Sequence, residues 1–514
     1  MTDLDRRVAE FAARDRGLAI EILREVVRIP ADYVDRAPDD GGDPSCGLSN
    51  HEGPRLEYLR RRIVEIGAVR SPDDVGFDAY GNLVWSVEDP DDPTPRAERR
   101  VIYLDGHSDT VKALRSQWRD KIGGGIDAYD GLVDPARVDN AFLERELGWL
   151  PPANEREHLV FGRGSADQLA GVVTQVIATR ILVELTGEGA LRGAIVRSYA
   201  TVTEEDNDGG GPRFVVERVL PSAGPELIPD VVILTEGTGD ARKGALGIYR
   251  GQRGRMQIEV TVTGRSCHGS MPWEGLNPLE HGGAILAEAA RAYDARRGFL
   301  DDAFLGHGTR TASWARLETP SDCAVPDRFV FRFDRRLTVG ETAEKAVEDV
   351  LALESVAAAR AAGLDVRVEV PVYDQPTWRG LRLGNPQIYP GWVTPEEHPA
   401  IACAVDTYKG VISPHVGEGG AGGALRREPR VDRWIFSTDG VGFPVSVDDR
   451  TIDVPESKGW VRAGAVKLPA IFGLGPGIEQ NTHKIGECVD ARELVHAIAF
   501  TARFPSVLAA HWKP

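Results

Sequence analysis

Short apolar segments that alternate with helical stretches limit this 514-residue chain to few folds. Helical periodicity covers roughly Leu4 to Arg28, the region near Pro54 to Gly67, and Asp167 to Glu184. The apolar segments are "VIYLD", "HLVFG", "GAIVRSYATV", "DVVILTE" and "PAIFGLG". Strands that are apolar on both faces and are connected by helices are typical of a parallel sheet. The pattern predicts an α/β domain whose mainly parallel sheet is covered by helices on both faces.

The middle of the chain has a different order of elements, which predicts a second domain. From Arg255 the predicted order is strand, helix, strand, strand, helix, strand, in "MQIEVTVTG", Leu279 to Arg296, "TRTASWARLE", "RFVFRFDRR", Glu341 to Ala362 and "LDVRVEVPV". This βαββαβ order is that of ferredoxin-like α+β domains. Chains of this length commonly divide into two or more domains. We expect residues 251–372 to form an inserted domain, and residues 1–250 and 373–514 to form the α/β domain.

Two long stretches, Lys112 to His158 and Asp374 to Arg430, lack clear periodicity. Long irregular segments in a compact enzyme are usually functional loops or disordered. We therefore expect loops there, and a further loop in the Gly- and Asp-rich segment around Cys46.

Charge and cysteine content exclude several classes of partner and site. The formal net charge of -18 disfavours nucleic acid and anionic membrane surfaces, and leaves small polar substrates open. The five cysteines are scattered and form no C-x-x-C pair, so carboxylates and histidines would have to hold any metal. The N-terminal segment is charged throughout and no segment has the uninterrupted apolar length of a membrane span, so we expect a cytoplasmic protein.

Acidic residues and histidines follow several predicted strands. They are His107 and Asp109, Asp167, Glu204 and Glu205, Glu236, and His483. Ligand sites of open α/β sheets lie just beyond the carboxyl ends of the strands. Histidines and carboxylates are the ligands that divalent metals take where thiolates are absent. Together these residues predict a metal site at this edge of the sheet.

Each of these residues alone has a simpler explanation. An H-x-D sequence is often only a loop hydrogen bond, and adjacent glutamates are usually solvated. A phosphate-binding loop in "GRGSADQLAG" is disfavoured because Asp167 takes the place of the third glycine and would repel a phosphate. Successive side chains of a strand point to opposite faces, so Glu204 and Glu205 either form a solvated loop entrance or have different partners. The joint occurrence of all these residues favours the metal site.

The order of the motifs is H-x-D, G-R-G-x-x-D, E-E, a later Glu, and a glycine-rich turn followed by His. This order resembles the co-catalytic zinc metallopeptidase and amidohydrolase family that includes aminoacylase, carboxypeptidase G, acetylornithine deacetylase and succinyl-diaminopimelate desuccinylase. The resemblance covers nearly the whole chain. The segments "GRSCHGSMPWEGLNP", "CAVPDRFVFRFDRRLTVGET", "YPGWVTPEEHP" and "RWIFSTDGVG" further resemble the branch labelled selenium-metabolism hydrolases.

The resemblance implies two metal positions that share one carboxylate. His107, Asp167 and Glu236 would hold one metal, and Asp167, Glu205 and His483 would hold the other. Zinc is the expected metal, and a site rich in carboxylates also accepts manganese or cobalt.

The resemblance also implies roles for two acids beside the metals. Asp109 would hydrogen-bond the second ring nitrogen of His107 and fix its tautomer. Glu204 would act as the general base that takes a proton from a metal-bridging water and passes it to the leaving nitrogen. The peptide bond between Asp167 and Gln168 would be cis.

The inserted domain resembles the lid and dimerisation domain of the family, which implies a homodimer. His268 would reach across the dimer to the oxyanion or the substrate carboxylate. Arg336 would receive a substrate carboxylate through its forked guanidinium, or would only pair with Asp334. We expect Cys267 to be a small buried neighbour of His268, and Asn277 to start a helix.

The Lys112 to His158 stretch follows the first metal strand directly, so it should border the substrate pocket. Its large aromatic residues would narrow that pocket or pack against the partner subunit. They are Trp118, Tyr129, Phe142 and Trp149.

The function that these residues favour is hydrolysis of an amide bond in an N-acyl or N-carbamoyl amino acid or a short peptide with a free carboxylate. One alternative keeps the metal site but releases ammonia from a ring or amidine carbon. Another is a metal-poor dimeric scaffold, against which the intact set of ligands argues. The substrate itself does not follow from these residues, because a fold does not fix a function.

Overall fold

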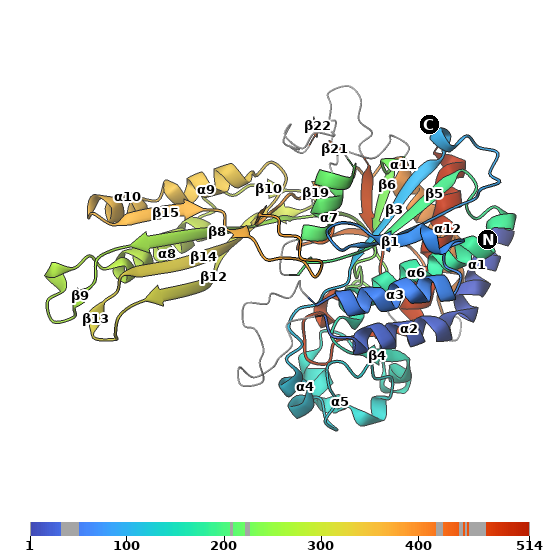
Figure 1. Ribbon diagram of the computed structural model, residues 1–514, viewed down its shortest axis with the longest axis horizontal. Helices are drawn as coiled ribbons and strands as arrows, with labels where there is room; N and C mark the ends of the chain where they lie inside the picture. The colour runs from blue at the N-terminus through green and yellow to red at the C-terminus, as the bar shows by residue number, and fades with distance from the viewer. Residues whose placement is uncertain are drawn as a thin grey trace.

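The computed structural model has two parts, a broad α/β domain and a long, narrow lid that projects from it (Figure 1). Both chain termini lie on the α/β domain. The structure describes residues 2–31, 51–205, 209–220, 227–417, 425–440, 446–447, 450–451 and 469–512. The loop predicted around Cys46 lies outside these residues.

The α/β domain contains a nine-stranded sheet in the order β1-β2-β5-β3-β6-β23-β7-β19, with β20 also paired to β7. The four neighbouring strands β5, β3, β6 and β23 are parallel, while β1 and β2 add antiparallel pairs at one edge. The bounds are Val75–Phe77 (β1), Leu83–Glu88 (β2), Arg100–His107 (β3), Ala194–Thr201 (β5), Val231–Leu234 (β6), Ile248–Gln252 (β7), Trp392–Val393 (β19), Val431–Trp434 (β20) and Ala470–Gly473 (β23). The predicted mainly parallel sheet is confirmed.

The register aligns the carboxyl ends of the parallel strands. His107, the last residue of β3, lies opposite Thr201, the last residue of β5. Leu234 at the end of β6 pairs with Asp105 of β3 on one side and with Gly473 of β23 on the other. Residues that follow these four strands therefore emerge at one edge of the sheet.

Long helices cover one face of this sheet, and a short helix covers part of the other. On the first face, the long helices pack in one hydrophobic cluster with strand residues such as Ile102, Leu104 and Ile233. The alternate strand residues Val101 and Tyr103 belong to a second cluster, on the face that includes the helical segment after α7 (Gly210–Phe214). The long helices are α1 (Asp3–Arg14), α2 (Arg16–Arg28), α3 (Gly53–Glu65), α6 (Ala170–Glu184), α11 (Pro399–Val411) and α12 (Ala491–His511).

The helix predicted over Leu4 to Arg28 is in fact two helices, α1 and α2, which meet at Asp15. The Asp15 carboxylate accepts hydrogen bonds from Arg14 at 2.8 and 2.7 Å and from Arg180 of α6 at 3.1 Å. Apolar residues continue on both sides of the break, so periodicity alone did not reveal it.

The core helix α6 is apolar nearly all round. With the turn before it, Ser165–Glu184 is long and apolar enough to cross a membrane by length and composition, contrary to the sequence-based expectation. However, 83% of this apolar stretch is buried inside the protein. Burial in the core accounts for its composition.

The lid has its own sheet in the order β12-β14-β8-β15, with antiparallel neighbours throughout. Its elements are β8 (Gly254–Thr263), α8 (Pro278–Asp294), β12 (Thr309–Glu318), β14 (Arg328–Leu337), α9 (Ala343–Leu351), α10 (Glu354–Ala361) and β15 (Asp365–Glu369). The predicted βαββαβ order is confirmed, although the second predicted helix is divided into α9 and α10. Met256, Ile258, Val260 and Val262 of β8 are buried in a hydrophobic cluster of the lid alone.

Short strands complete the lid and its junction with the α/β domain. At the far end of the lid, β9 (Cys267–His268) pairs with β13 (Ala324–Val325). The remaining short strands are β4 (Leu159–Phe161), β10 (Asp301–Asp302), β11 (Gly306–His307), β16 (Val372–Tyr373), β17 (Asn385–Pro386), β18 (Ile388–Tyr389), β21 (Ser446–Val447), β22 (Arg450–Thr451) and β24 (Cys488–Asp490).

Both stretches without periodicity contain helices. The first holds α4 (Arg115–Lys121) and α5 (Asn140–Glu146), and the second holds α11. The aromatic residues predicted to narrow the pocket or contact a partner instead pack within their own subunit. Trp118, Tyr129 and Phe142 are buried in one hydrophobic cluster, and Trp149 packs against the main core. For Trp118, Tyr129 and Phe142 that prediction was wrong, because their side chains form a small core of their own.

Candidate metal centre

The predicted site residues of the α/β domain meet at the carboxyl edge of the four parallel strands. His107 ends β3, Glu204 and Glu205 follow β5, and Glu236 follows β6. His483 lies in the loop after β23. Asp167 comes from the irregular turn Ser165–Leu169 that leads into α6, where its own φ and ψ are not helical.

Asp167 lies between the two histidines. One carboxylate oxygen, Oδ1, is 3.0 Å from Nε2 of His107, and the other, Oδ2, is 3.0 Å from Nε2 of His483. Nε2 of His107 is also 3.6 Å from Oε2 of Glu236, and Nε2 of His483 is 3.1 Å from Oε1 of Glu205. The ligand atoms within each of three groups lie within 4.8 Å of one another: His107, Asp167 and Glu236; Asp167, Glu205 and His483; and His107, Glu204 and Glu205.

Asp109 fixes the positions of three of these residues. Nδ1 of His107 lies 3.0 Å from the backbone oxygen of Asp109 and 3.4 Å from its carboxylate, so the backbone oxygen is the nearer partner. The carboxylate accepts hydrogen bonds from the backbone N–H groups of Glu204 at 3.1 Å and Glu205 at 3.0 Å. Sequence reasoning found the contact with His107 but missed the two contacts with the glutamates.

A turn in the backbone brings both adjacent glutamates to the site. Thr203 has a positive φ of 61°, which bends the chain just before Glu204. Both carboxylates consequently contribute to the ligand groups, and the expected alternation of an extended strand does not apply. The solvated loop entrance is therefore excluded for this pair.

The charges at the site favour binding of cations. Burial raises the pKa of Glu236 to about 8, and the neighbouring charge of Asp167 adds to this. Burial also raises the pKa of Glu204, although the charge of His107 acts in the opposite direction. Although burial opposes it, the charge of Glu205 raises the pKa of His483 to about 12. Four buried or half-buried carboxylates thus converge on two imidazoles, which is a donor set that suits divalent metals.

Comparison with known proteins identifies the family. Residues 250–360 match the sequence model of a peptidase dimerisation domain, M20_dimer. The uncharacterized protein YgeY of Escherichia coli K12 is 34% identical over 483 residues, which cover 94% of this chain and 92% of YgeY. The chain belongs to the M20 family of co-catalytic metallopeptidases.

Solved structures of peptidases share the fold. The dipeptidase Dug1p of Saccharomyces cerevisiae is 11% identical, with a TM-score of 0.61 over 99% of each chain. The YXEP protein of Bacillus subtilis, described as a dinuclear metal binding peptidase, is 12% identical, with a TM-score of 0.54 over 98% of this chain and 99% of its own. These structures show the shared fold. The matches to YgeY and to the dimerisation domain make the protein an enzyme of the M20 peptidase family, while its place in the selenium-metabolism branch stays a prediction.

In this M20 enzyme, Gln168 supports the metal centre from the α6 side. The peptide bond between Asp167 and Gln168 is cis, as predicted. Nε2 of the fully buried Gln168 donates to Oε2 of Glu236 at 2.6 Å and to Oδ2 of Asp439 at 2.8 Å. Sequence reasoning missed Asp439, which lies 271 positions from Gln168 in the chain.

A buried ion pair holds the other side of Asp167. Arg163 donates to Oε2 of Glu487 at 2.6 Å, and both side chains are 1% exposed. Oε1 of Glu487 accepts the backbone N–H groups of Ala166 at 3.1 Å and Asp167 at 3.2 Å. In the sequence, Arg163 stands out only as part of the G-R-G motif. Glu487 lies 324 positions away and belongs to no motif that links it to the site.

The two predicted site residues of the lid make their described side-chain hydrogen bonds within the lid. His268 is exposed on β9, at the end of the lid farthest from the α/β domain (Figure 1). Arg336 donates two hydrogen bonds to Asp334, at 2.7 and 3.1 Å, and its role toward a substrate carboxylate stays a prediction. Cys267 is partly exposed, and the prediction that it is buried was wrong because β9 and its partner β13 are two-residue strands at the end of the lid. Asn277 starts α8, as predicted.

Proposed function

We propose that this M20 enzyme hydrolyses an amide bond of an N-acyl or N-carbamoyl amino acid or a short peptide, using two divalent metals. The observation that carries the proposal is the position of Asp167, whose two oxygens each lie 3.0 Å from a different histidine. A carboxylate in this position suits a bridge between two metals. Each histidine also has a second acidic neighbour, Glu236 for His107 and Glu205 for His483.

The residues present fit two metal ions. Burial raises the pKa of Glu236, and the neighbouring charge of Asp167 adds to this; a bound cation would offset both effects. Zinc is the first choice for a set of histidines and carboxylates, and manganese or cobalt would also be accepted. When bound, such metals polarise a carbonyl and make water a stronger nucleophile near neutral pH.

Glu204 is the proposed general base. Its carboxylate lies in the group with His107 and Glu205, so it reaches the same space as the ligands. Because burial raises its pKa, it can hold a proton taken from the attacking water and release it to the leaving nitrogen. The hydrogen bond from its N–H group to Asp109 fixes the backbone, leaving the side chain as the moving part.

His268 is the proposed donor to the oxyanion, acting across a homodimer. Nδ1 of His268 accepts the backbone N–H group of Ser270 at 3.1 Å and lies 2.8 Å from its hydroxyl. A backbone N–H group can only donate, so the proton of the neutral ring is on Nε2, ready to be donated outward. Since His268 lies far from its own metal centre, the oxyanion that it serves would belong to the other subunit.

Metal analysis combined with a substrate screen tests the proposal. Purified protein would be analysed for bound metals and assayed with N-acyl amino acids, dipeptides and ureido acids. Two metals per subunit and release of a free amino acid are the expected results. Ammonia without a carboxylic acid product would favour the deaminase, and an inactive dimer that binds no metal would favour the scaffold.

A further inference from the structure

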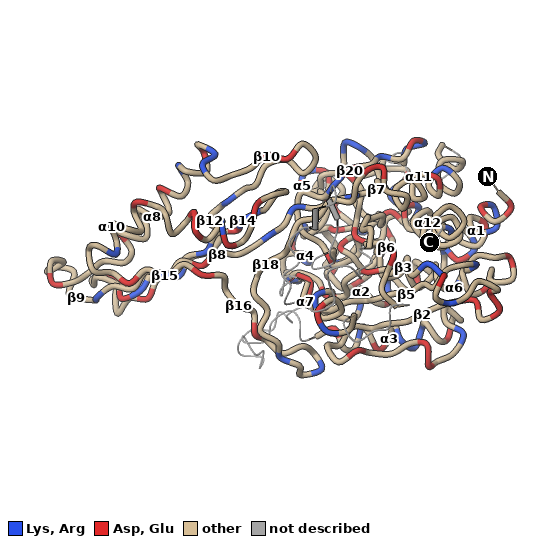
Figure 2. Tube along the Cα trace, turned by 90° about the horizontal axis from the view of Figure 1, so that it is seen from above, with Lys and Arg blue, Asp and Glu red and all other residues tan. Residues whose placement is uncertain are grey.

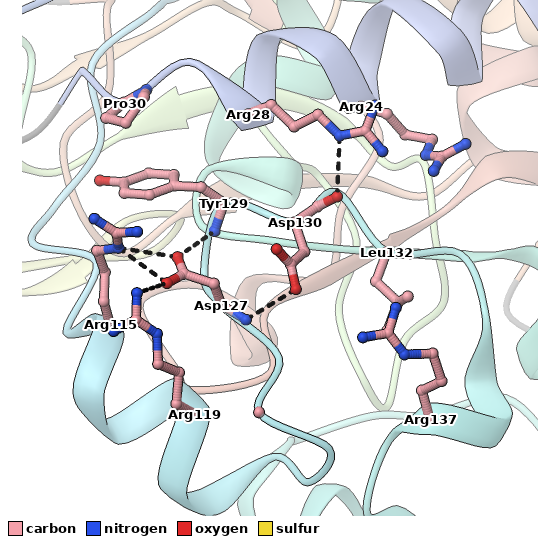
Figure 3. Close-up of a pocket in the computed structure, with 11 residues that line it drawn as sticks. Arg24, Arg28, Pro30, Arg115, Arg119, Asp127, Tyr129, Asp130, Leu132 and Arg137 are labelled. Atoms are coloured by element: carbon pink, nitrogen blue, oxygen red, sulfur yellow. Dashed lines mark hydrogen bonds and ion pairs between the residues drawn. The ribbon is translucent and has the colours of Figure 1, made fainter.

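A second charged site lies between α2, α4 and the loop that follows α4 (Figure 3). It is a pocket of about 750 Å³ lined by five arginines: Arg24, Arg28, Arg115, Arg119 and Arg137. We refer to it as the arginine pocket. None of its described lining residues belongs to the metal centre.

The charge of the arginine pocket differs from that of the rest of the chain. Its five arginines are accompanied by two aspartates, Asp127 and Asp130, which leaves a net charge of +3 in a protein of net charge -18. Elsewhere acidic and basic residues are interspersed along the described part of the trace (Figure 2). That sum already includes Asp127, which accepts hydrogen bonds from Arg115 at 3.0 Å and from Arg119 at 2.5 Å. The remaining excess charge attracts an anion.

Several guanidinium groups of the pocket have N–H donors without a partner among the described residues. Arg24 uses only Nε, which donates to the backbone oxygen of Gly131 at 2.8 Å, and its terminal nitrogens have no partner among the described residues. Arg115 likewise uses only Nε in its hydrogen bonds, and the side chain of Arg137 has no partner in the described part of the chain. These donors come from α2, from α4 and from the short helical turn Pro135–Arg137.

Tyr129 gives the pocket an aromatic wall. It is 7% exposed, and its buried hydroxyl has no hydrogen-bond partner within the described residues. The guanidinium carbon of Arg115 lies 5.4 Å from the centre of its ring. Pro30 and Leu132 add apolar surface to the same pocket.

We propose that the arginine pocket binds an organic phosphate that carries at least two phosphate groups, of the size of a nucleoside diphosphate. Tetrahedral phosphate groups offer oxygens in several directions, and so can reach arginines from three separate elements, whereas one planar carboxylate reaches fewer. The volume lies within the roughly 300–1,000 Å³ that small-molecule sites span. The wall formed by Tyr129, Pro30 and Leu132 suits the organic part.

Isothermal titration calorimetry of the full-length protein tests this site without measuring catalysis. Pyrophosphate and ADP would be titrated into the wild type, Arg137→Gln and the control Arg192→Gln. Arg192 is also exposed and without a described side-chain partner, but it lies in the turn before β5. Both probes should bind, ADP more tightly. Arg137→Gln should weaken binding by on the order of tenfold, Arg192→Gln should not, and added salt should lower the affinity.

Several results would overturn the assignment. Pyrophosphate could bind Arg137→Gln as well as wild type, or lose affinity equally in Arg192→Gln, in which case Arg137 does not form the site. Binding that disappears in His107→Ala but survives in Arg137→Gln would mean that the probe binds at the metal centre. Citrate binding more tightly than pyrophosphate, or ADP binding more weakly, would exclude the organic phosphate as the ligand class.

Discussion

The metal centre and the tip of the lid support their histidines in different ways. His107 is 1% exposed, and its two ring nitrogens face Asp109 and Asp167 of the same subunit. His268 is exposed on a two-residue strand whose only described strand partner is the equally short β13. A histidine whose two ring nitrogens both have partners in its own subunit suits a metal ligand. A histidine with one unpaired ring nitrogen suits a donor to a substrate bound in another subunit.

The supporting structure differs in the same way. At the metal centre, acids are held by backbone N–H groups and by buried partners such as Gln168 and Arg163. The lid instead has a sheet whose edge strand β12 is largely exposed, with Trp314 45% exposed. An exposed sheet edge is a natural place for another chain to pair. The comparison implies that substitutions at the two regions should change different measured quantities.

Asp167→Asn should have the largest effect, because it removes charge from both ligand groups at once. Both metals should be lost or strongly weakened, and activity should fall by more than the roughly 10⁴-fold upper range for loss of a general base. Metal content measured by mass spectrometry, beside the rate, checks this. Retention of two tightly bound metals would show that Asp167 is not the bridge.

Glu204→Gln should lower the rate by roughly 10²- to 10⁴-fold while both metals stay bound, because it removes a base but not a ligand. The matched variant Glu205→Gln should instead weaken one metal, and excess metal in the assay should restore part of its rate. Metal content and rate, measured for both variants, separate the roles. If the two variants exchange these results, the roles of the two glutamates are exchanged too.

His268→Ala should lower the rate by roughly 10²- to 10³-fold, as expected for loss of an oxyanion donor, with metal content unchanged. Mixing this variant with Glu204→Gln should recover activity in hybrid dimers, which contain one site with both groups intact. Subunit exchange would be verified by native mass spectrometry. No recovery in verified hybrids would place His268 in its own subunit's site, or outside the reaction.

Asn277→Ala should have the smallest effect and should act on the lid alone. The Asn277 side chain accepts the N–H group of Leu279 at 3.0 Å at the start of α8. Its loss should cost about 1 kcal/mol of the free energy of unfolding, with metal content unchanged. Asn277→Ser, which can still cap, should be close to wild type in urea unfolding. Loss of metal in Asn277→Ala would show that the lid and the metal centre do not respond independently to substitution.

Local patterns in the sequence predicted the features that depend on neighbouring residues. Four of the five apolar segments formed strands of the central sheet, and the residues directly after them, such as His107 and Glu236, were the candidate ligands. The fifth segment, "HLVFG", instead forms β4, which pairs with β24 outside that sheet. The βαββαβ order of the lid followed from periodicity in the same way. The capping role of Asn277 could be predicted because a cap depends only on the next few residues.

Features that depend on distant segments could not be predicted. Asp439 and Glu487 support the metal centre from parts of the chain that have no local sequence relation to it. The aromatic residues near Trp118 were assigned to the pocket because sequence does not show which apolar groups pack together. The break at Asp15 depends on Arg180 of α6, 165 positions away.

Asp109 couples the positions of a proposed metal ligand and of the proposed base. Its backbone oxygen faces His107, and its carboxylate holds the N–H groups of Glu204 and Glu205. The end of β3 and the turn after β5 are therefore expected to move together. A change that relocates the proposed base must also move a ligand, so a new spacing between them requires compensating substitutions elsewhere. Variation in substrate size is thus left to the lid and the loops, where residues can change one at a time.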